Sequence, residues 1–203
     1  MDHAMKIDVL DDNKTVLDRL FFDARSQNGW LDQPVDLALL ERIHDIAKMG
    51  PTSMNCSPLR IVYLTTSAAR ERLKPAVAAG NVSQIMTCPV VAIFATDHSF
   101  AEKMPFLFPH TDGKGHFERN PHLVDDTAFR NATLQAAYYM LAARAVGLDC
   151  GPISGFNRAA TDEIFFAGTA IRSNFICGIG HGDPAKLFPR HPRLPFDEAC
   201  TVL

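Results

Sequence analysis

The sequence predicts an α+β fold in one domain. Helical and strand-like patterns follow one another without the regular alternation that a doubly wound parallel sheet requires. The length of 203 residues favours a single domain over residues 1–203, and it is enough to bury a full core without metals or disulfides. The content of 47% apolar and 21% charged residues is that of a globular protein, which excludes a disordered chain.

The first half of the chain carries patterns of three helices and two strands. Residues 1–12 are polar and acidic, and we expect them to form a flexible lead. Apolar residues at helical spacing predict helices, and runs of branched and aromatic residues predict strands. The expected elements are helices over 15–24, 36–49 and 67–77, a polar loop over 51–58, a turn at 79–81, and strands over 60–66 and 90–96.

The second half begins with a long segment, residues 97–122, which has no clear period and contains prolines, glycines and aromatic residues. A loop this long in a compact domain is usually functional or disordered, so we expect a lid. A long buried helix is expected over 123–146, a second helix over 159–167 and a strand over 174–179. The proline-rich residues 183–203 are expected to form an extended tail that packs on a partner subunit.

Charge and cysteine content exclude several classes of function. The net charge is −3 with scattered Lys and Arg, so we expect no nucleic-acid partner. No stretch approaches the roughly 20 apolar residues that span a bilayer, and the polar N-terminus does not resemble a signal peptide. Five cysteines without a Cys-x-x-Cys pair argue against a disulfide framework and a thiolate zinc site, so we expect a cytoplasmic protein without a metal.

Several searches for known motifs exclude particular kinds of active site. The chain has neither a phosphate-binding P-loop nor the Gly-x-Ser-x-Gly turn of hydrolases. The glycines at 178–182 follow a strand, but Pro184 stands where the helix of a dinucleotide site should open, so we reject that interpretation. The spacing of His110, His116 and His122 does not match a zinc site. Cys56 could be a nucleophile if a base lay beside it, although an incidental buried thiol is the simpler interpretation.

Four short polar segments interrupt the apolar pattern at element boundaries. They are residues 25–28, 51–55, 81–84 and 190–193. A flavin mononucleotide, FMN, would satisfy them together, because its phosphate prefers Arg and hydroxyl donors and its pyrimidine edge prefers Asn and Gln amides. Each segment alone is more often a turn or a cap, so only the combination indicates a site.

The order and spacing of these segments resemble the nitroreductase family of FMN enzymes. The matching motifs are Arg25-Ser26, Pro51-Thr52-Ser53-Met54-Asn55, Gly80-Asn81 with Gln84 one turn on, Pro152-Ile153-Ser154-Gly155-Phe156, and Arg190-His191-Pro192-Arg193-Leu194-Pro195. The resemblance implies cofactor contacts from Arg25, Ser26, Asn28, Pro51, Thr52, Ser53, Asn55, Asn81, Gln84, Ser154, Gly155, Arg190, His191 and Arg193. In that family the first and last motifs meet the phosphate, and the 51–55 loop comes from the other subunit.

The same resemblance implies a fold and a reaction. It implies a central, mostly antiparallel sheet flanked by helices, in an intertwined homodimer with two FMN sites at the interface. It also implies a ping-pong cycle, in which NADH or NADPH delivers a hydride to the flavin before a small aldehyde, quinone or nitro substrate accepts it. The sequence identifies no catalytic acid or base.

A closer resemblance is to the malonic semialdehyde reductase branch of pyrimidine degradation. It rests on the segments 28–30, 50–53, 107–110, 129–131 and 151–156. The expected reaction is the reduction of malonic semialdehyde to 3-hydroxypropionate. The alternatives are a broad nitroarene or quinone reductase, a flavin-binding protein without turnover, and a hydrolase that uses Cys56.

The predicted lid is also expected to contact the flavin and the substrate. Residues 97–122 contain large apolar side chains that solvated linkers seldom carry, so we expect them to cover the flavin. The apolar residues are Phe106, Leu107, Phe108 and Phe117. The basic residues among them, which could meet a substrate carboxylate, are His110, Lys114, His116 and Arg119. The alternative is a surface loop whose basic residues face solvent.

Overall fold

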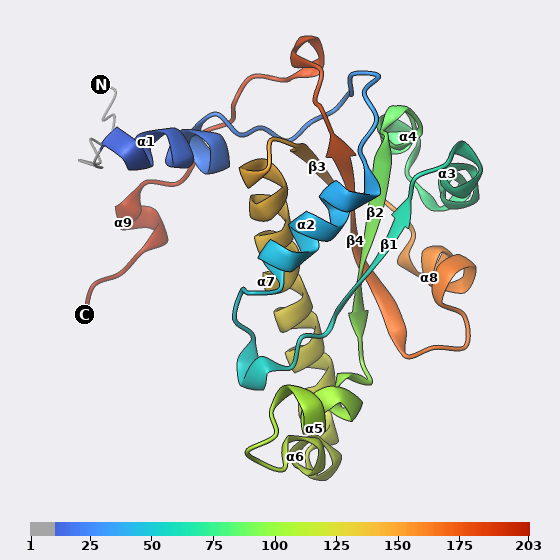
Figure 1. The fold of residues 1–203 in the computed structure, drawn as a ribbon, viewed down its shortest axis with the longest axis vertical. Helices are drawn as coiled ribbons and strands as arrows, with labels where there is room; N and C mark the ends of the chain where they lie inside the picture. The colour runs from blue at the N-terminus through green and yellow to red at the C-terminus, as the bar shows by residue number, and fades with distance from the viewer. Residues whose placement is uncertain (1–10) are drawn as a thin grey trace.

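A four-stranded antiparallel sheet with helices on both faces forms the centre of the protein (Figure 1). The structure is a computed structural model that describes residues 11–203. Most of the expected lead therefore lies outside the described residues, and its last two residues, Asp11 and Asp12, already belong to α1. The predicted α+β fold, with an antiparallel sheet flanked by helices, is confirmed.

The strands lie in the order β1-β2-β4-β3, and every neighbouring pair is antiparallel. Their bounds are Leu59–Leu64 for β1, Val90–Asp97 for β2, Asp149–Ile153 for β3 and Ile171–Gly180 for β4. All residues of β2 are buried, as expected for a continuous apolar run that forms an inner strand. β1 and β3 are therefore the two edges of the sheet.

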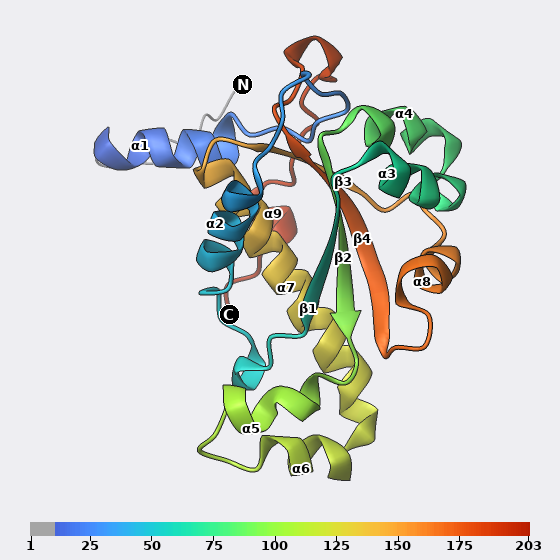
Figure 2. The same cartoon turned by 45° about the vertical axis from the view of Figure 1, so that its right-hand side comes forward.

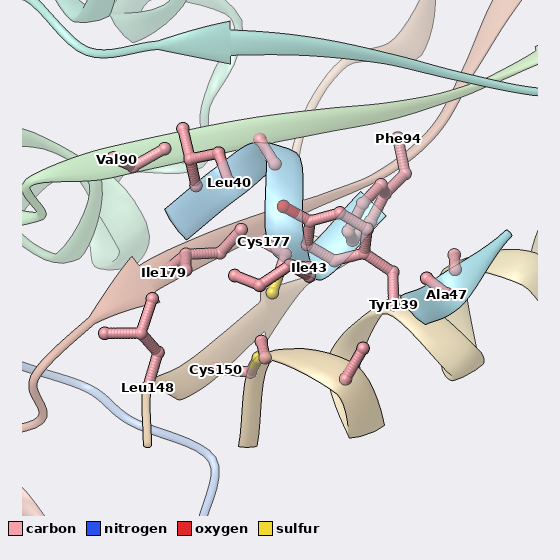
Figure 3. Packing of buried hydrophobic residues seen from close by; sticks show 14 residues of the cluster. Leu40, Ile43, Ala47, Val90, Phe94, Tyr139, Leu148, Cys150, Cys177 and Ile179 are labelled. Carbon is pink, nitrogen blue, oxygen red and sulfur yellow. The ribbon is translucent and has the colours of Figure 1, made fainter. Parts of the chain in front are cut away.

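Helices cover the two faces of the sheet separately (Figure 2). One face carries α2 (Leu37–Ala47) and α7 (Val124–Ala145), and the cluster in Figure 3 packs Leu40, Ile43 and Tyr139 against the strands. The other face carries α3 (Ser67–Leu73), α4 (Ala79–Thr87) and α8 (Arg158–Phe166) around a second apolar cluster. Within residues 11–203, no helix has both the length and the apolar character needed to cross a membrane.

The central helix α7 is less enclosed than its composition predicted. Its buried residues recur at helical spacing along one face, toward the sheet. Phe129 and Leu134 point away from that face, and their exposed fractions are 47% and 44%. Exposed large apolar residues on a long helix leave surface that a second protein chain could cover.

The structure corrects the expected secondary structure at three places. Residues 97–122 are largely helical, with α5 (Met104–Leu107) and α6 (Gly113–Arg119) between the 3₁₀ turns Phe100–Lys103 and Pro121–Leu123. The turn expected at 79–81 is the start of α4, and β3 was not predicted. Helices this short show no hydrophobic period in the sequence. Pro152 makes β3 hard to recognise as a strand, and it is tolerated there because β3 is an edge strand.

Both ends of the described chain extend from the sheet (Figure 1). α1 (Asp11–Leu17) continues as the π-helical turn Asp18–Phe22, and the tail contains the 3₁₀ turn Pro184–Lys186 and α9 (Phe196–Ala199). The tail is therefore not fully extended, because proline is well suited to the start of a helical turn. All residues from 188 to 203 are exposed, so the tail lies on the surface and adds nothing to the core of its own chain.

Candidate functional site

The first predicted segment, residues 25–28, lies along the edge strand β3. Ser26 forms a parallel bridge with Cys150, and the backbone N–H of Gln27 donates to the Cys150 carbonyl at 3.0 Å. Asn28 is exposed, and its side-chain amide donates to the Ser26 carbonyl at 3.5 Å. Backbone pairing thus holds this segment against the sheet and leaves the Ser26 and Asn28 side chains accessible.

The predicted amides of α4 reach the same edge. The side-chain amide of Gln84 donates to the Gln27 backbone carbonyl at 2.6 Å, and the backbone carbonyl of Gln84 accepts from the Trp30 indole at 3.1 Å. One turn earlier, the Asn81 amide donates to the Gly155 carbonyl at 3.2 Å. A Cβ atom at Gly155 would lie 2.5 Å from the Asn81 amide nitrogen, so glycine permits this close approach.

Two arginines join the tail to the N-terminal segment. The Arg25 guanidinium donates to the Phe188 carbonyl. In return, Arg190 donates to the carbonyls of Phe22 and Ala24 at 2.6 and 2.9 Å. Two positive groups from distant parts of the sequence therefore gather at one junction, next to the exposed Ser26. Charged donors in this arrangement suit a phosphate.

The rest of the tail does not reach this junction in the single chain. Arg193 donates to the carbonyls of His191 and Pro192 at 2.9 and 3.1 Å, and all three residues are exposed. Ser154 is exposed directly after the end of β3, beside the half-buried Gly155. The sequence motifs of residues 25–28, 81–84, 154–155 and 190 are thus brought together, whereas Arg193 contacts only the neighbouring backbone of His191 and Pro192.

The residues at this edge fit FMN. The Arg25 and Arg190 pair suits a phosphate, and the amides of Asn81 and Gln84 suit the pyrimidine edge of the ring. Gln27 is only 5% exposed, yet its side-chain oxygen accepts no hydrogen bond from the described residues. A buried acceptor without a donor is uncommon in native proteins, so Gln27 is a further candidate site residue that the motif comparison did not include.

The glycines at 178–182, rejected as a dinucleotide motif, have a packing role beside the site. A Cβ atom at Gly178 would lie 2.4 Å from the Trp30 ring, and one at Gly182 would lie 2.1 Å from the Gln27 side chain. These glycines leave room for Trp30 and Gln27 against β4. They therefore position the N-terminal segment and need no nucleotide to explain them.

The predicted loop 51–55 lies elsewhere in the chain. It precedes β1, which is the opposite edge of the sheet from β3, about 14 Å away at the usual strand spacing. The backbone N–H of Ser53 donates to the Asn131 side chain at 2.8 Å, and the Asn55 amide donates to the Leu107 carbonyl at 2.8 Å. One chain alone therefore does not place this loop beside Arg25.

The backbone of this loop is unusual. Met54, Asn55 and Ser57 have φ angles of +50°, +52° and +41°, and they are the non-glycine residues with positive φ among those described. The left-handed region is unfavourable for side chains larger than glycine, and such conformations concentrate at functional sites. Three in one short loop make it a candidate functional element by an argument independent of the sequence motif.

The helical segment over residues 100–123 surrounds its own small core. Phe117 is 4% exposed and packs at this core with Phe100 and Met104, so it does not cover a flavin in this chain. Phe106, in contrast, is 84% exposed. The expectation that the four apolar residues act together as a cover is therefore wrong for Phe117, because folding of the segment needs it inside.

The basic residues of this segment are not equivalent. Lys114 pairs with Glu102 at 2.7 Å, which raises its pKa, and Arg119 pairs with Asp112 at 3.1 Å. The Gly115 N–H and the Arg119 guanidinium together lower the pKa of Asp112. His116 is half-buried beside Phe117.

His110 differs from the other three. It is exposed, its ring lies against Phe108 with centroids 4.0 Å apart, and no ion pair holds it within residues 11–203. Among the four predicted basic residues, His110 is thus the one best placed to contact a ligand.

Cys56 does not resemble a nucleophile. Its side chain is fully buried in the core of the helical segment, and burial raises the pKa of its thiol. Because the thiolate is the reactive form, a raised pKa and lack of access both oppose the hydrolase alternative.

Comparisons with known proteins converge on one family. The family model described as "Nitroreductase family" matches residues 24–181. A relative from Ralstonia pickettii, named as a candidate NADH dehydrogenase/NAD(P)H nitroreductase, is 56% identical over 186 residues, which cover 90% of this chain and 95% of the relative. One from Cupriavidus pinatubonensis with the same kind of name is 56% identical over 92% of this chain and 97% of its own length.

Solved structures agree in fold. A candidate nitroreductase from Bacillus subtilis superposes with a TM-score of 0.83 at 22% identity, over 94% of this chain and all of its own. A candidate nitroreductase from Exiguobacterium sibiricum, solved in complex with FMN, superposes with a TM-score of 0.78 at 20% identity, over 91% of this chain and 96% of its own.

Proposed function

The chain belongs to the nitroreductase family, and from this premise we propose that it is an FMN-dependent oxidoreductase that consumes NADH or NADPH. The polar edge formed by residues 25–28, α4 and β3 supports this assignment, as do the names of the relatives that are 56% identical. Bound FMN would supply hydride transfer between the nicotinamide and an acceptor. The protein's part is to bind and orient FMN and the two substrates.

Each cofactor site is shared by two copies of the chain. The observation that carries this proposal is the separation of the 51–55 loop from the β3 edge, although both belong to the set of motifs expected at one site. A homodimer in which loop 51–55 of one copy faces the β3 edge of the other brings the two halves together. The exposed Phe129 and Leu134 of α7 supply apolar surface for such contact.

The tail offers the second dimer contact. Residues 188–203 are exposed and include Phe188, Leu194 and Phe196, with exposed fractions of 65–68%. Among residues 11–203, no strand pairs with the outer edge of β1, and a groove of about 610 Å³ lies beside it between α2 and α7. A free strand edge and an apolar groove are natural acceptors for an extended segment. We place the tail of one copy against this face of the other.

The residues that hold FMN divide into three groups under this proposal. The phosphate meets cations and hydroxyls at the junction of the tail and the N-terminal segment, and the ring meets amides and the backbone at the β3 edge. The phosphate group consists of Arg25, Ser26, Asn28, Arg190, His191 and Arg193, the ring group of Asn81, Gln84, Ser154 and Gly155, and the partner's group of Pro51, Thr52, Ser53 and Asn55. We also place the protein in the reducing cytoplasm, because its five cysteines are free thiols.

The substrate that we propose is malonic semialdehyde. A hydride adds to the aldehyde carbon and a proton to its oxygen, so the semialdehyde, NAD(P)H and H⁺ give 3-hydroxypropionate and NAD(P)⁺. The segments at 107–110 and 129–131 support this branch, and they lie on the helical segment and on α7, next to loop 51–55. The second candidate is a nitroarene or quinone reductase, which the names of the 56%-identical relatives favour.

Substitution of His110 separates these two candidates. The His110→Ala variant is expected to raise KM for malonic semialdehyde roughly tenfold, because a hydrogen bond to a charged group is worth about 1.5–3 kcal/mol. The reduction of a neutral quinone should change little. The measurement is kcat/KM for both substrates at saturating NAD(P)H.

Arg119→Ala is the matched control, because Asp112 already neutralises this cation. It should affect neither substrate selectively. If His110→Ala lowered kcat/KM equally for both substrates, His110 would not bind the substrate carboxylate. If the unsubstituted protein did not reduce malonic semialdehyde at all, the nitroarene or quinone candidate would replace it.

A further inference from the structure

Two buried amide side chains stand out on α7. Asn131 and Gln135 lie one helical turn apart and are 3% and 7% exposed, among small apolar neighbours such as Ala128, Ala132 and Ala136. Burial of a polar side chain is costly unless its hydrogen bonds are made inside the protein. Their partners therefore indicate why polar residues occupy these positions.

Both amides hold the backbone of the segment from Ser53 to Leu59. The Asn131 oxygen accepts from the Ser53 N–H at 2.8 Å, and the Gln135 oxygen accepts from the Leu59 N–H at 2.9 Å. The Asn131 amide also donates to the Thr127 carbonyl at 2.8 Å, which fixes the orientation of its side chain. One rigid helix thus holds the start and the end of a seven-residue segment.

The residues between these two contacts carry the three left-handed conformations. Such backbone persists only where surrounding contacts determine it fully. The residues that flank the segment also contact it: the Ser57 N–H donates to the Thr52 hydroxyl at 3.2 Å, and Arg60 donates to the Ser57 carbonyl at 3.0 Å. Asn55 donates to the Leu107 carbonyl at 2.8 Å. The two buried amides complete this set of contacts from the core side.

We infer that Asn131 and Gln135 are positioning residues for the flavin site of the partner subunit. This inference rests on the proposed function, in which residues 51–55 face the partner's FMN. The amides touch neither FMN nor substrate. They set the place of the loop through its backbone, and a loop displaced by about 1 Å can cost up to a hundredfold in rate.

An ordinary stabilising role is the competing explanation, and a matched variant separates the two. Tyr139 lies on the same helix, is fully buried, and hydrogen-bonds Tyr63 at 2.9 Å, and it forms no hydrogen bond with residues 53–59. Tyr139→Phe therefore removes a buried hydrogen bond of α7 and leaves the loop in place. Asn131→Leu and Gln135→Met remove the loop contacts at similar side-chain volume.

The experiment compares these variants as FMN-loaded dimers. For Asn131→Leu and Gln135→Met we expect kcat/KM to fall roughly tenfold or more, with an altered visible circular dichroism of bound FMN and faster amide exchange over residues 53–59. Asn131→Asp and Gln135→Glu keep an acceptor oxygen and should restore most of the dichroism signal. Tyr139→Phe should lower Tm without changing the dichroism or kcat/KM.

Three outcomes decide the inference. Loss of activity and altered dichroism in the two loop variants, with rescue by the acidic variants, supports it. If the loop variants show the same kcat/KM and dichroism as Tyr139→Phe at an equal loss of Tm, the amides only stabilise the fold. The inference is then overturned. If the unsubstituted protein binds no FMN, the proposed function fails first, and the inference fails with it.

Discussion

Mixing two inactive variants, Asn55→Ala and Arg25→Ala, is expected to restore activity. Each variant alone damages both sites of its own homodimer. If a site combines Arg25 of one copy with Asn55 of the other, a mixed dimer has one intact site and one doubly damaged site. Random reassociation makes about half of the dimers mixed, so about a quarter of the activity should return.

The measurement is NAD(P)H oxidation after the two proteins are unfolded together and refolded with FMN. The control pairs Arg25→Ala with Gln84→Ala, whose side chains both serve the β3 edge of one chain. No site is then intact in any dimer, so this mixture should stay inactive. Recovery in the control, or none with Asn55→Ala, would contradict the shared site.

Replacement of Arg25 by Ala is expected to weaken FMN affinity by one to two decades. A charge-assisted hydrogen bond to an anion contributes about 1.5–3 kcal/mol, which corresponds to roughly this change in Kd. The same change at Arg193 should have a similar effect if the tail brings its guanidinium to the phosphate. Fluorescence quenching of FMN during titration of the apoprotein measures both.

Lysine should rescue either position only in part, because it keeps the charge but loses the forked geometry of the guanidinium. Arg25 also has a structural contact to the Phe188 carbonyl, so Tm of the apoprotein is measured alongside. A drop in FMN affinity without a drop in apoprotein Tm assigns the effect to the phosphate. Unchanged affinity in Arg25→Ala and in Arg193→Ala would overturn the assignment.

The parts of the fold that the sequence predicted have strong local signals. The apolar run of β2 and the helical spacing of α2 and α7 depend on near neighbours in the chain, and the structure contains all three. α5 and α6 were missed because they have four and seven residues, too few to display a period. Proline is unfavourable inside a sheet, and only the position of β3 at the sheet edge, a tertiary property, permits Pro152 there.

The candidate site likewise has parts with a local sequence signal and parts that depend on contacts between distant residues. The Arg25-Ser26 and Gly80-Asn81 motifs are short and recognisable, and the structure brings their segments to one edge. The contact between Ser53 and Asn131 joins residues 78 positions apart, so no local pattern could indicate it. Polar amides in the otherwise apolar centre of α7 were the available signal for Asn131 and Gln135. The acidic partners of Lys114 and Arg119 could likewise be found only in three dimensions.

The absorbance spectrum of the purified protein, recorded anaerobically before and after addition of NAD(P)H, tests the central claim most directly. We expect a yellow dimer whose flavin absorbance is bleached by NAD(P)H and returns when malonic semialdehyde or a quinone is added. The flavin released by denaturation should chromatograph as FMN. A protein that binds no flavin even when FMN is supplied during refolding, or whose bound flavin NAD(P)H does not bleach, would contradict the account.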